Sequence, residues 1–253
     1  ALAAAARTAG KPIVALKSGR SDQARAATQS HTASLAGSGA GAAALLARLG
    51  IAQVTSLPQM LETLKLLHFA GPLPGNAVAS ISCSGGEASL MADTALDHAI
   101  TLPPLTPSQA SALRAALGPR VALANPLDYH TFIWGDVPAM TATLAAALEG
   151  PADIGVMIAD FPRPDRCDPA AWDCIFEAGA EARHRVGKPL ALIATLPDCL
   201  SEAMAERAIA SGLIPLLGLD DGLTAIAHAA WLGQARATPA PLLLPGPPTQ
   251  PHT

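Results

Sequence analysis

The chain has 253 residues, of which 50% are hydrophobic and 14% charged, and its formal net charge is −4. This composition excludes an intrinsically disordered chain, because it supplies enough apolar side chain to bury a core. The low charge and the 3% aromatic content argue against a dedicated nucleic-acid-binding protein. No apolar run reaches the roughly 18 residues that a membrane span needs. We therefore expect a soluble globular protein with no nucleic-acid or membrane partner.

The four cysteines show neither a CxxC pair nor the histidine spacing of a zinc site. The chain is also longer and poorer in cysteine than the small disulfide-stapled domains of secreted proteins. These features predict reduced thiols, a cytoplasmic location and no metal site.

In chain order, short apolar runs alternate with helical patterns. Before residue 72 the pattern predicts strand, helix, strand and helix at Pro12–Leu16, Ser34–Leu49, Ile51–Val54 and Leu57–Phe69. Further strands are expected at Ala77–Ser82, Ile100–Leu102, Val121–Ala124, Ile154–Ala159, Leu190–Ala194 and Ile214–Leu216. Further helices are expected at Glu87–His98, Pro107–Leu117, Val137–Leu148, Asp168–Arg185, Leu200–Ala210 and Asp221–Ala235. Strands separated by helices of about 10–15 residues are typical of βαβ units and parallel sheets.

The segment Gly71–Gly75 reads GPLPG and predicts a linker between two α/β domains. The sequence GKPIVAL at Gly10–Leu16 is echoed by GKPLALI at Gly187–Ile193, where again a glycine can end a helix before a buried strand begins. We expect two flavodoxin-like, or Rossmann-like, parallel-sheet domains at residues 1–72 and 73–238, the first truncated at its N-terminus. Residues 239–253 are rich in proline and predict a linker or tail. The chain begins in what reads as the second half of a helix, which predicts a fragment of a longer polypeptide.

The first informative motif follows the first predicted strand. It consists of KSGR at Lys17–Arg20 and SHTASLAG at Ser30–Gly37, where a helix rich in small residues begins. Helix N-termini carry unpaired N–H groups and partial positive charge, so His31 is well placed to act as a nucleophile toward phosphorus. Lys17 and Arg20 could balance the charge of the phosphoryl group. The alternative is that His31 only hydrogen-bonds its own loop.

A second motif, ISCSGGEAS at Ile81–Ser89, predicts a strand, a glycine turn and a helix. Ser84, Gly85 and Gly86 would let the backbone approach a ligand closely and form an anion site at the helix start. The alternative is a tight connection without a ligand. Asn125 and Asp128 follow another predicted strand, and they either belong to the site or form an Asx-type turn.

Taken in order, KPIVALKSGRSDQARAATQSHTASLAG, ISCSGGEASLMAD and ANPLD resemble the NDP-forming acyl-CoA synthetase family, which includes ADP-forming acetyl-CoA synthetase and is related to succinyl-CoA synthetase. The resemblance is clearest from Lys11 to Asp128 and implies the middle portion of such an enzyme. It implies that His31 is phosphorylated by an acyl phosphate and passes the phosphate to a nucleoside diphosphate. It also implies that two helix N-termini face the phosphohistidine, the second beginning at Ser84–Gly86. The family usually has glycine where this chain has Ala33.

The resemblance implies an acid–thiol ligase that converts an acid, CoA and NTP into acyl-CoA, NDP and phosphate. Its substrates would be CoA, ATP with Mg²⁺ and a small carboxylic acid, with no tightly bound cofactor. Its partners would be an upstream CoA-binding domain and an ATP-grasp domain or subunit, and a homo-oligomer is compatible with this. Two other classes stay open: a non-catalytic sensor region of a protein acetyltransferase, and a flavodoxin-like binding module. The presence of His31 favours catalysis, because a sensor needs no nucleophile there.

Overall fold

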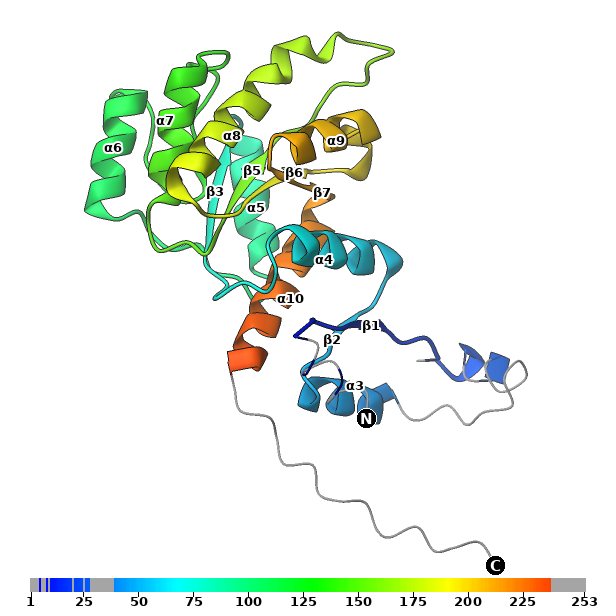
Figure 1. Ribbon diagram of the computed structural model, residues 1–253. Coiled ribbons are helices and arrows are strands. Elements are labelled where there is room, and N and C mark those ends of the chain that lie inside the picture. The colour runs from blue at the N-terminus through cyan, green and yellow to red at the C-terminus, as the bar shows by residue number, and fades with distance from the viewer. Residues whose placement is uncertain are drawn as a thin grey trace, which may run out of the picture.

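Two parallel sheets organise the chain in the computed structural model, which describes residues 5, 8, 10–19, 21–24, 26–27 and 39–237 (Figure 1). The smaller sheet pairs β1 (Val14–Leu16) with β2 (Ala52–Val54). The larger sheet contains β3 (Val78–Ser82), β4 (Leu127–Asp128), β5 (Ile154–Ile158), β6 (Leu190–Ala194) and β7 (Ile214–Leu217). The predicted α/β class with parallel sheets is therefore confirmed, whereas the division into domains at residues 1–72 and 73–238 stays a prediction.

The five strands of the larger sheet run in the order β4-β3-β5-β6-β7, and every neighbouring pair is parallel. In order of appearance within this sheet, that is 2-1-3-4-5, the order of flavodoxin-like sheets. The first strand, β3, has β4 on one side and β5 on the other. The direction of winding reverses there, and ligands of such sheets bind outside the carboxyl ends of the strands at this switch point.

Helices cover both faces of this sheet because side chains alternate along each strand. Val156 and Ile158 of β5 point into a core shared with α5 (Gly85–Ala95) and α10 (Leu219–Ala237), whereas Met157 points into the opposite core. Four helices pack on that opposite side: α6 (Pro107–Leu117), α7 (Val137–Leu148), α8 (Asp173–Val186) and α9 (Glu202–Ala210). Short 3₁₀ turns precede α8 and α9, at Pro169–Trp172 and Pro197–Cys199. The result is a three-layer α/β/α arrangement.

The helix α4 (Leu57–Phe69) links the two sheets, and α3 (Gly39–Arg48) precedes β2. Leu66 of α4 is fully buried in the core that α10 lines, and the buried Glu62 accepts the Leu217 N–H at 2.9 Å at the end of β7. Burial raises the pKa of Glu62, and Lys65 pairs with its carboxylate at 2.7 Å. The segment before residue 72 is thus tied to the larger sheet by both packing and hydrogen bonding.

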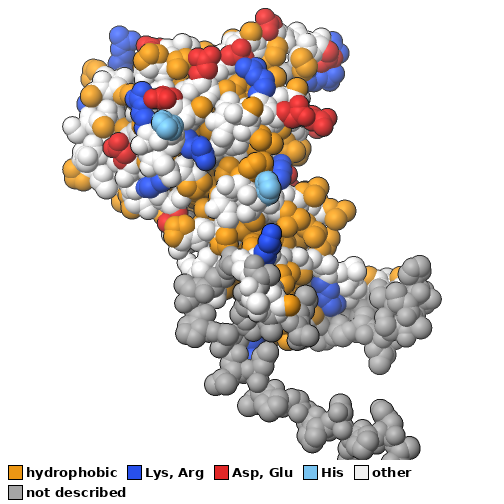
Figure 2. All heavy atoms as spheres, viewed as in Figure 1, with side chains coloured by type: hydrophobic (Ala, Val, Ile, Leu, Met, Phe, Trp, Pro, Cys, Tyr) orange, Lys and Arg blue, Asp and Glu red, His pale blue; other side chains and the backbone are white. Residues whose placement is uncertain are grey.

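The outer face of α4 is apolar. Figure 2 shows hydrophobic side chains gathered over this part of the molecule, and the large exposed ones on α4 are Leu57, Leu61, Leu64 and Phe69. In the part of the chain that the structure describes, no helix is both long and apolar enough to span a bilayer.

Two predicted strands are wrong. Residues 121–124 are irregular, and β4 lies instead at Leu127–Asp128, because the Asn125 carboxamide takes the place of a strand beside β3. It accepts the Ser80 N–H at 2.9 Å and donates to the Val78 carbonyl at 2.8 Å, as strand backbone would. Residues 100–102 form no strand but one isolated bridge, between Thr101 and Ala77. Two prolines follow immediately, and proline cannot donate to a ladder.

Candidate functional site

The turn between β3 and α5 lies at the switch point of the larger sheet. Ser84 is the N-cap of α5, with an extended backbone at φ −133°, and its Oγ accepts the Glu87 N–H at 3.4 Å. The Ser82 hydroxyl donates to the Ser84 carbonyl at 3.1 Å. Serine at the N-cap is among the strongest helix-start signals, so the local sequence itself begins the helix here.

The first turn of α5 begins with two exposed glycines. A Cβ at Gly85 would lie 3.2 Å from Asp128 Oδ2, so glycine allows the carboxylate to approach the helix start closely. A Cβ at Gly86 would make only an ordinary contact, 3.5 Å from Ser84 Oγ. The N–H groups of a first helical turn have no partner within the helix and carry partial positive charge. This uncovered turn has the local geometry of an anion site.

Asp128 ends β4 beside this turn and is paired with His130. Its Oδ1 accepts the His130 N–H at 2.8 Å, and its Oδ2 lies 3.6 Å from His130 Nδ1. The φ angle of His130 is +58°, a left-handed conformation that residues other than glycine seldom adopt. Its side chain is 45% exposed, and its ring lies 5.4 Å from the Phe132 ring. The structure thus places an accessible imidazole near the α5 turn, and the sequence analysis did not single it out.

Two more carboxylates reach the same edge of the sheet, Glu87 from α5 and Asp160 from the end of β5. Asp160 accepts the Thr195 N–H at 2.7 Å and also the Thr195 hydroxyl. Burial, and then the charges of Asp160 and Asp128, raise the pKa of Glu87 to about 7. Burial and the charge of Glu87 raise the pKa of Cys83 to about 11, so this thiol is protonated at neutral pH. Among the described residues, no three His, Cys, Asp or Glu side chains are grouped so as to hold a metal ion.

Asn125 and Asp128, which the sequence places in one short motif, lie in different surroundings. The Asn125 carboxamide hydrogen-bonds backbone groups. Besides its two bonds to β3, it donates to the Pro103 carbonyl at 3.0 Å. It holds in place the segment that carries Asp128 to the α5 turn. Asn125 therefore has a structural role, whereas the Asp128 carboxylate lies beside the α5 turn.

The other predicted site residues belong to the smaller sheet. Lys17 follows β1 and donates to the Ser18 carbonyl at 3.3 Å. Among the described residues, Lys17 makes no hydrogen bond or ion pair with the α5 turn. Arg20 and His31 lie outside the described residues. The role of all three in phosphate chemistry stays a prediction.

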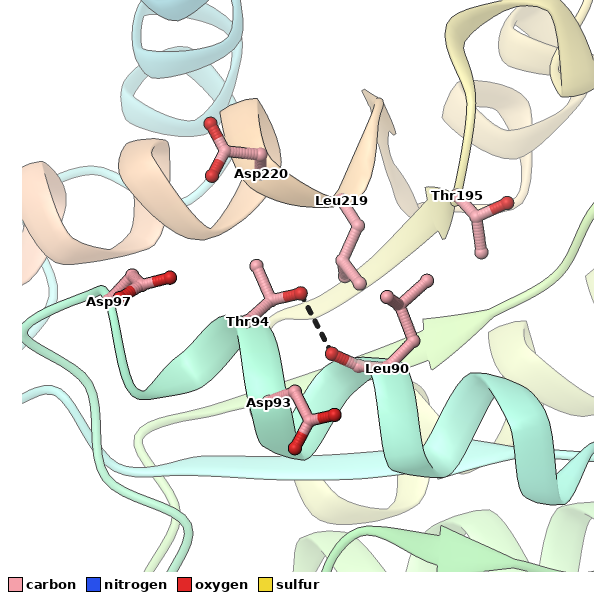
Figure 3. A pocket seen from close by; sticks show the side chains of 7 residues that line it. All are labelled: Leu90, Asp93, Thr94, Asp97, Thr195, Leu219 and Asp220. Carbon is pink, nitrogen blue, oxygen red and sulfur yellow. Dashed lines mark hydrogen bonds between the residues drawn. The ribbon is translucent and has the colours of Figure 1, made fainter.

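A separate hollow of about 410 Å³ lies between α5 and the start of α10 (Figure 3). Its lining consists of Leu90, Asp93, Thr94, Asp97, Thr195, Leu219 and Asp220. The dashed line in Figure 3 is the 2.7 Å hydrogen bond from the Thr94 hydroxyl to the Leu90 carbonyl, which stays within the helix. The three aspartates of this hollow repel an anion, but carboxylates also lie around the α5 turn. The α5 turn is the better candidate for a phosphate because it lies at the switch point of the sheet.

Comparison with known proteins agrees with the motifs. Residues 1–67 match the family described as the succinyl-CoA ligase like flavodoxin domain. The alpha subunit of an ADP-forming acetate–CoA ligase II from Pyrococcus furiosus is 35% identical over 135 residues, which make up 53% of this chain and 29% of that subunit. A trans-feruloyl-CoA synthase from an unknown prokaryotic organism is 32% identical over 165 residues, 65% of this chain and 23% of the synthase.

Residues 1–67 therefore carry a succinyl-CoA ligase like flavodoxin domain, and the chain is similar to ADP-forming acetate–CoA ligases of the NDP-forming acyl-CoA synthetase family. An ADP-forming acetate–CoA ligase from Methanocaldococcus jannaschii, 32% identical over 118 residues, is a further relative. The aligned segments span only 17% to 29% of the length of these curated relatives.

The fold of the family is also found in a solved structure, the dinucleotide forming acetyl-coenzyme A synthetase 1 of Ca. Korarchaeum cryptofilum in complex with phosphate and ADP. The TM-score is 0.73 at 22% identity, and the match covers 90% of this chain and 48% of that one. At this identity the likeness shows the fold alone. It extends well beyond residue 67, where the family match of the sequence ends.

Proposed function

We propose that this chain is the central part of an NDP-forming acid–CoA ligase that works through a phosphohistidine at His31. The overall reaction joins a carboxylic acid to CoA while NTP is converted to NDP and phosphate. The observation that carries the proposal is the Ser84–Gly86 turn, an uncovered helix start at the switch point of a flavodoxin-like sheet. In the direction of NTP synthesis, this turn would bind the phosphoryl group that His31 carries.

In the direction of NTP synthesis, a ring nitrogen of His31 attacks the phosphorus of an acyl phosphate. The P–O bond to the acyl group breaks, and the acid leaves as its carboxylate. The terminal phosphate oxygen of NDP then attacks the same phosphorus, the P–N bond breaks, and NTP and free imidazole result. A covalent carrier divides one difficult transfer into two easier in-line displacements.

The described residues contribute electrostatics rather than covalent chemistry. Negative charge spreads over the phosphoryl oxygens during each displacement, and backbone N–H groups fixed at a helix start stabilise that charge without reorganising. Ser84 holds the first turn of α5 in place as its N-cap. Lys17 and Arg20 would balance part of the phosphoryl charge.

The rest of the ligase would be an upstream CoA-binding domain and an ATP-grasp domain or subunit. Relatives are named for acetate and for ferulate, so the acid is a carboxylic acid whose size this segment does not define. CoA and ATP with Mg²⁺ are substrates in this proposal, and no resident cofactor is required.

The test uses the full-length protein incubated with labelled NTP or with acyl phosphate. We expect a phosphoryl label that is labile in acid and stable in base, as a phosphoramidate is and phosphoserine is not. His31→Ala should abolish both the label and CoA ligation, because a covalent carrier cannot be replaced by proximity alone. His184→Ala is the matched control, since His184 is exposed at the end of α8 and should leave both unchanged.

Two results would contradict the proposal. Undiminished ligation by His31→Ala would exclude the phosphohistidine, and no label in the wild-type protein would exclude the ligase itself. In the second case the sensor class becomes the better explanation.

A further inference from the structure

Glu87 occupies the third position of α5 and is not explained by helix capping. In a capping box, a glutamate there would accept the backbone N–H of the N-cap residue. Here Oε2 of Glu87 is buried and has no hydrogen-bond partner. A buried carboxylate oxygen without a partner is costly, so this oxygen calls for a proton or a ligand.

The groups that face Glu87 come from every strand end around the switch point. Cys83 follows β3, Asp128 ends β4, and Asp160 follows β5. Two of these neighbours are carboxylates, and the Cys83 thiol is uncharged at neutral pH. The environment therefore disfavours a negative charge on Glu87.

A phosphoryl group at the start of α5 would make this conflict sharper. Such a group would place roughly two negative charges within one helical turn of Glu87. The N–H groups of the turn attract that charge, but an ionised Glu87 would oppose it. The conflict disappears when the carboxyl is protonated, because it then becomes a hydrogen-bond donor.

We infer that Glu87 serves the phosphoryl-transfer site as a neutral carboxyl group that donates a hydrogen bond to the phosphate at the α5 turn. This inference rests on the proposed function, because it assumes that the phosphoryl group is bound at that turn. The raised pKa of Glu87, about 7, is in keeping with it. Below pH 7 the carboxyl group is protonated and can donate to the phosphate. As the pH rises through 7, it loses its proton and repels the phosphate instead.

The test compares the wild-type full-length enzyme with Glu87→Gln, whose amide keeps the shape and a donor but cannot ionise. The KM for inorganic phosphate is measured from pH 6 to 8 in the direction that consumes acyl-CoA, NDP and phosphate. Phosphate itself titrates in this range, but it does so equally for both enzymes, so the ratio of the two KM values isolates Glu87. With a pKa of about 7, the wild-type KM should equal that of Glu87→Gln near pH 6 and exceed it about tenfold at pH 8.

Two further variants separate charge from hydrogen bonding. Glu87→Met has neither charge nor donor, so its KM should exceed that of Glu87→Gln about tenfold at every pH. Glu202→Gln is the matched control, since Glu202 is also acidic and in the first turn of a helix, α9, and its KM should follow that of the wild type.

A ratio that stays flat with pH would overturn the inference, as would a Glu87→Gln enzyme that binds phosphate more weakly than the wild type at every pH. Either result, with the label on His31 intact, leaves the proposed function standing. Loss of the label from the wild-type protein removes the proposed function and this inference together.

Discussion

Two helices begin at the same edge of the larger sheet, and their first turns differ. The first turn of α5 has two exposed glycines and one half-buried acid, Glu87. The first turn of α10 has two aspartates, Asp220 and Asp221, and it follows the outer strand β7. Aspartates in a first turn neutralise the partial positive charge of the helix, so α10 supplies its own anion.

From this difference we expect a helix N-terminus to bind an anion where the first residues of the helix carry no side chain that covers it. The start of α5 also lies at the switch point, where the loops after neighbouring strands diverge. The helix α10 instead follows β7, the outermost strand of the sheet. The start of α5 thus combines two exposed glycines with a place at the switch point, and α10 has neither feature. Substitutions that exchange these features between the two helices test the comparison.

Making α5 resemble α10 should have the largest effect. Gly86→Asp places a carboxylate in the uncovered turn, where a Cβ meets only ordinary contacts. We expect phosphoryl transfer in the full-length enzyme to fall about 100-fold or more, as when an electrostatic contact to the transition state is lost. The free energy of unfolding should be unchanged or slightly higher, because an acid in the first turn favours the helix.

The neutral variant Gly86→Asn is the control for size. It should retain most of the transfer activity, so that the charge and not the volume of the side chain accounts for the loss. Equal losses in the two variants would mean that the turn is sterically blocked and would remove the electrostatic explanation.

Removing the cap hydroxyl should have a smaller effect that separates structure from function. Ser84 caps α5 and Ser201 caps α9 in the same way, each through an Oγ that accepts the N–H three residues on. Ser84→Ala and Ser201→Ala should each lower the free energy of unfolding by about 1 kcal/mol in denaturant titrations. Only Ser84→Ala should also slow phosphoryl transfer, and a similar slowing in Ser201→Ala would attribute it to stability.

The α5 turn also shows what the sequence can and cannot predict. The motif Ser84-Gly85-Gly86 is local, and the strand, turn and helix predicted from it are present, although the helix begins at Gly85 rather than at Glu87. The groups around Glu87 are not local. Asp128 and Asp160 reach it through strand order, which no local pattern encodes, so its burial and raised pKa were missed.

The error at β4 has a similar origin. Residues 121–124 have the apolar character of a strand, yet a side chain, the Asn125 carboxamide, makes the ladder bonds to β3 instead. Hydrophobic patterns predict strands that pair through backbone groups, and they do not predict a side chain that takes the place of a strand. The one signal available for His130 was its position two residues after Asp128, at the carboxyl end of a strand, where functional side chains of parallel sheets gather.

The smallest effect is expected when α10 is made to resemble α5. Asp220→Asn removes one of the two charges of its first turn, and with it the charge on the group that lies 3.0 Å from His98 Nε2. The Asp220 side chain is 70% exposed, so solvent screens both interactions, and the free energy of unfolding should change by less than about 0.5 kcal/mol. Phosphoryl transfer should equal that of the wild type, because Asp221 remains and α10 begins away from the switch point. A clear change in the KM for phosphate would show that the start of α10 and the acidic hollow beside it take part in binding the anion, and the contrast between the two helices would then fail.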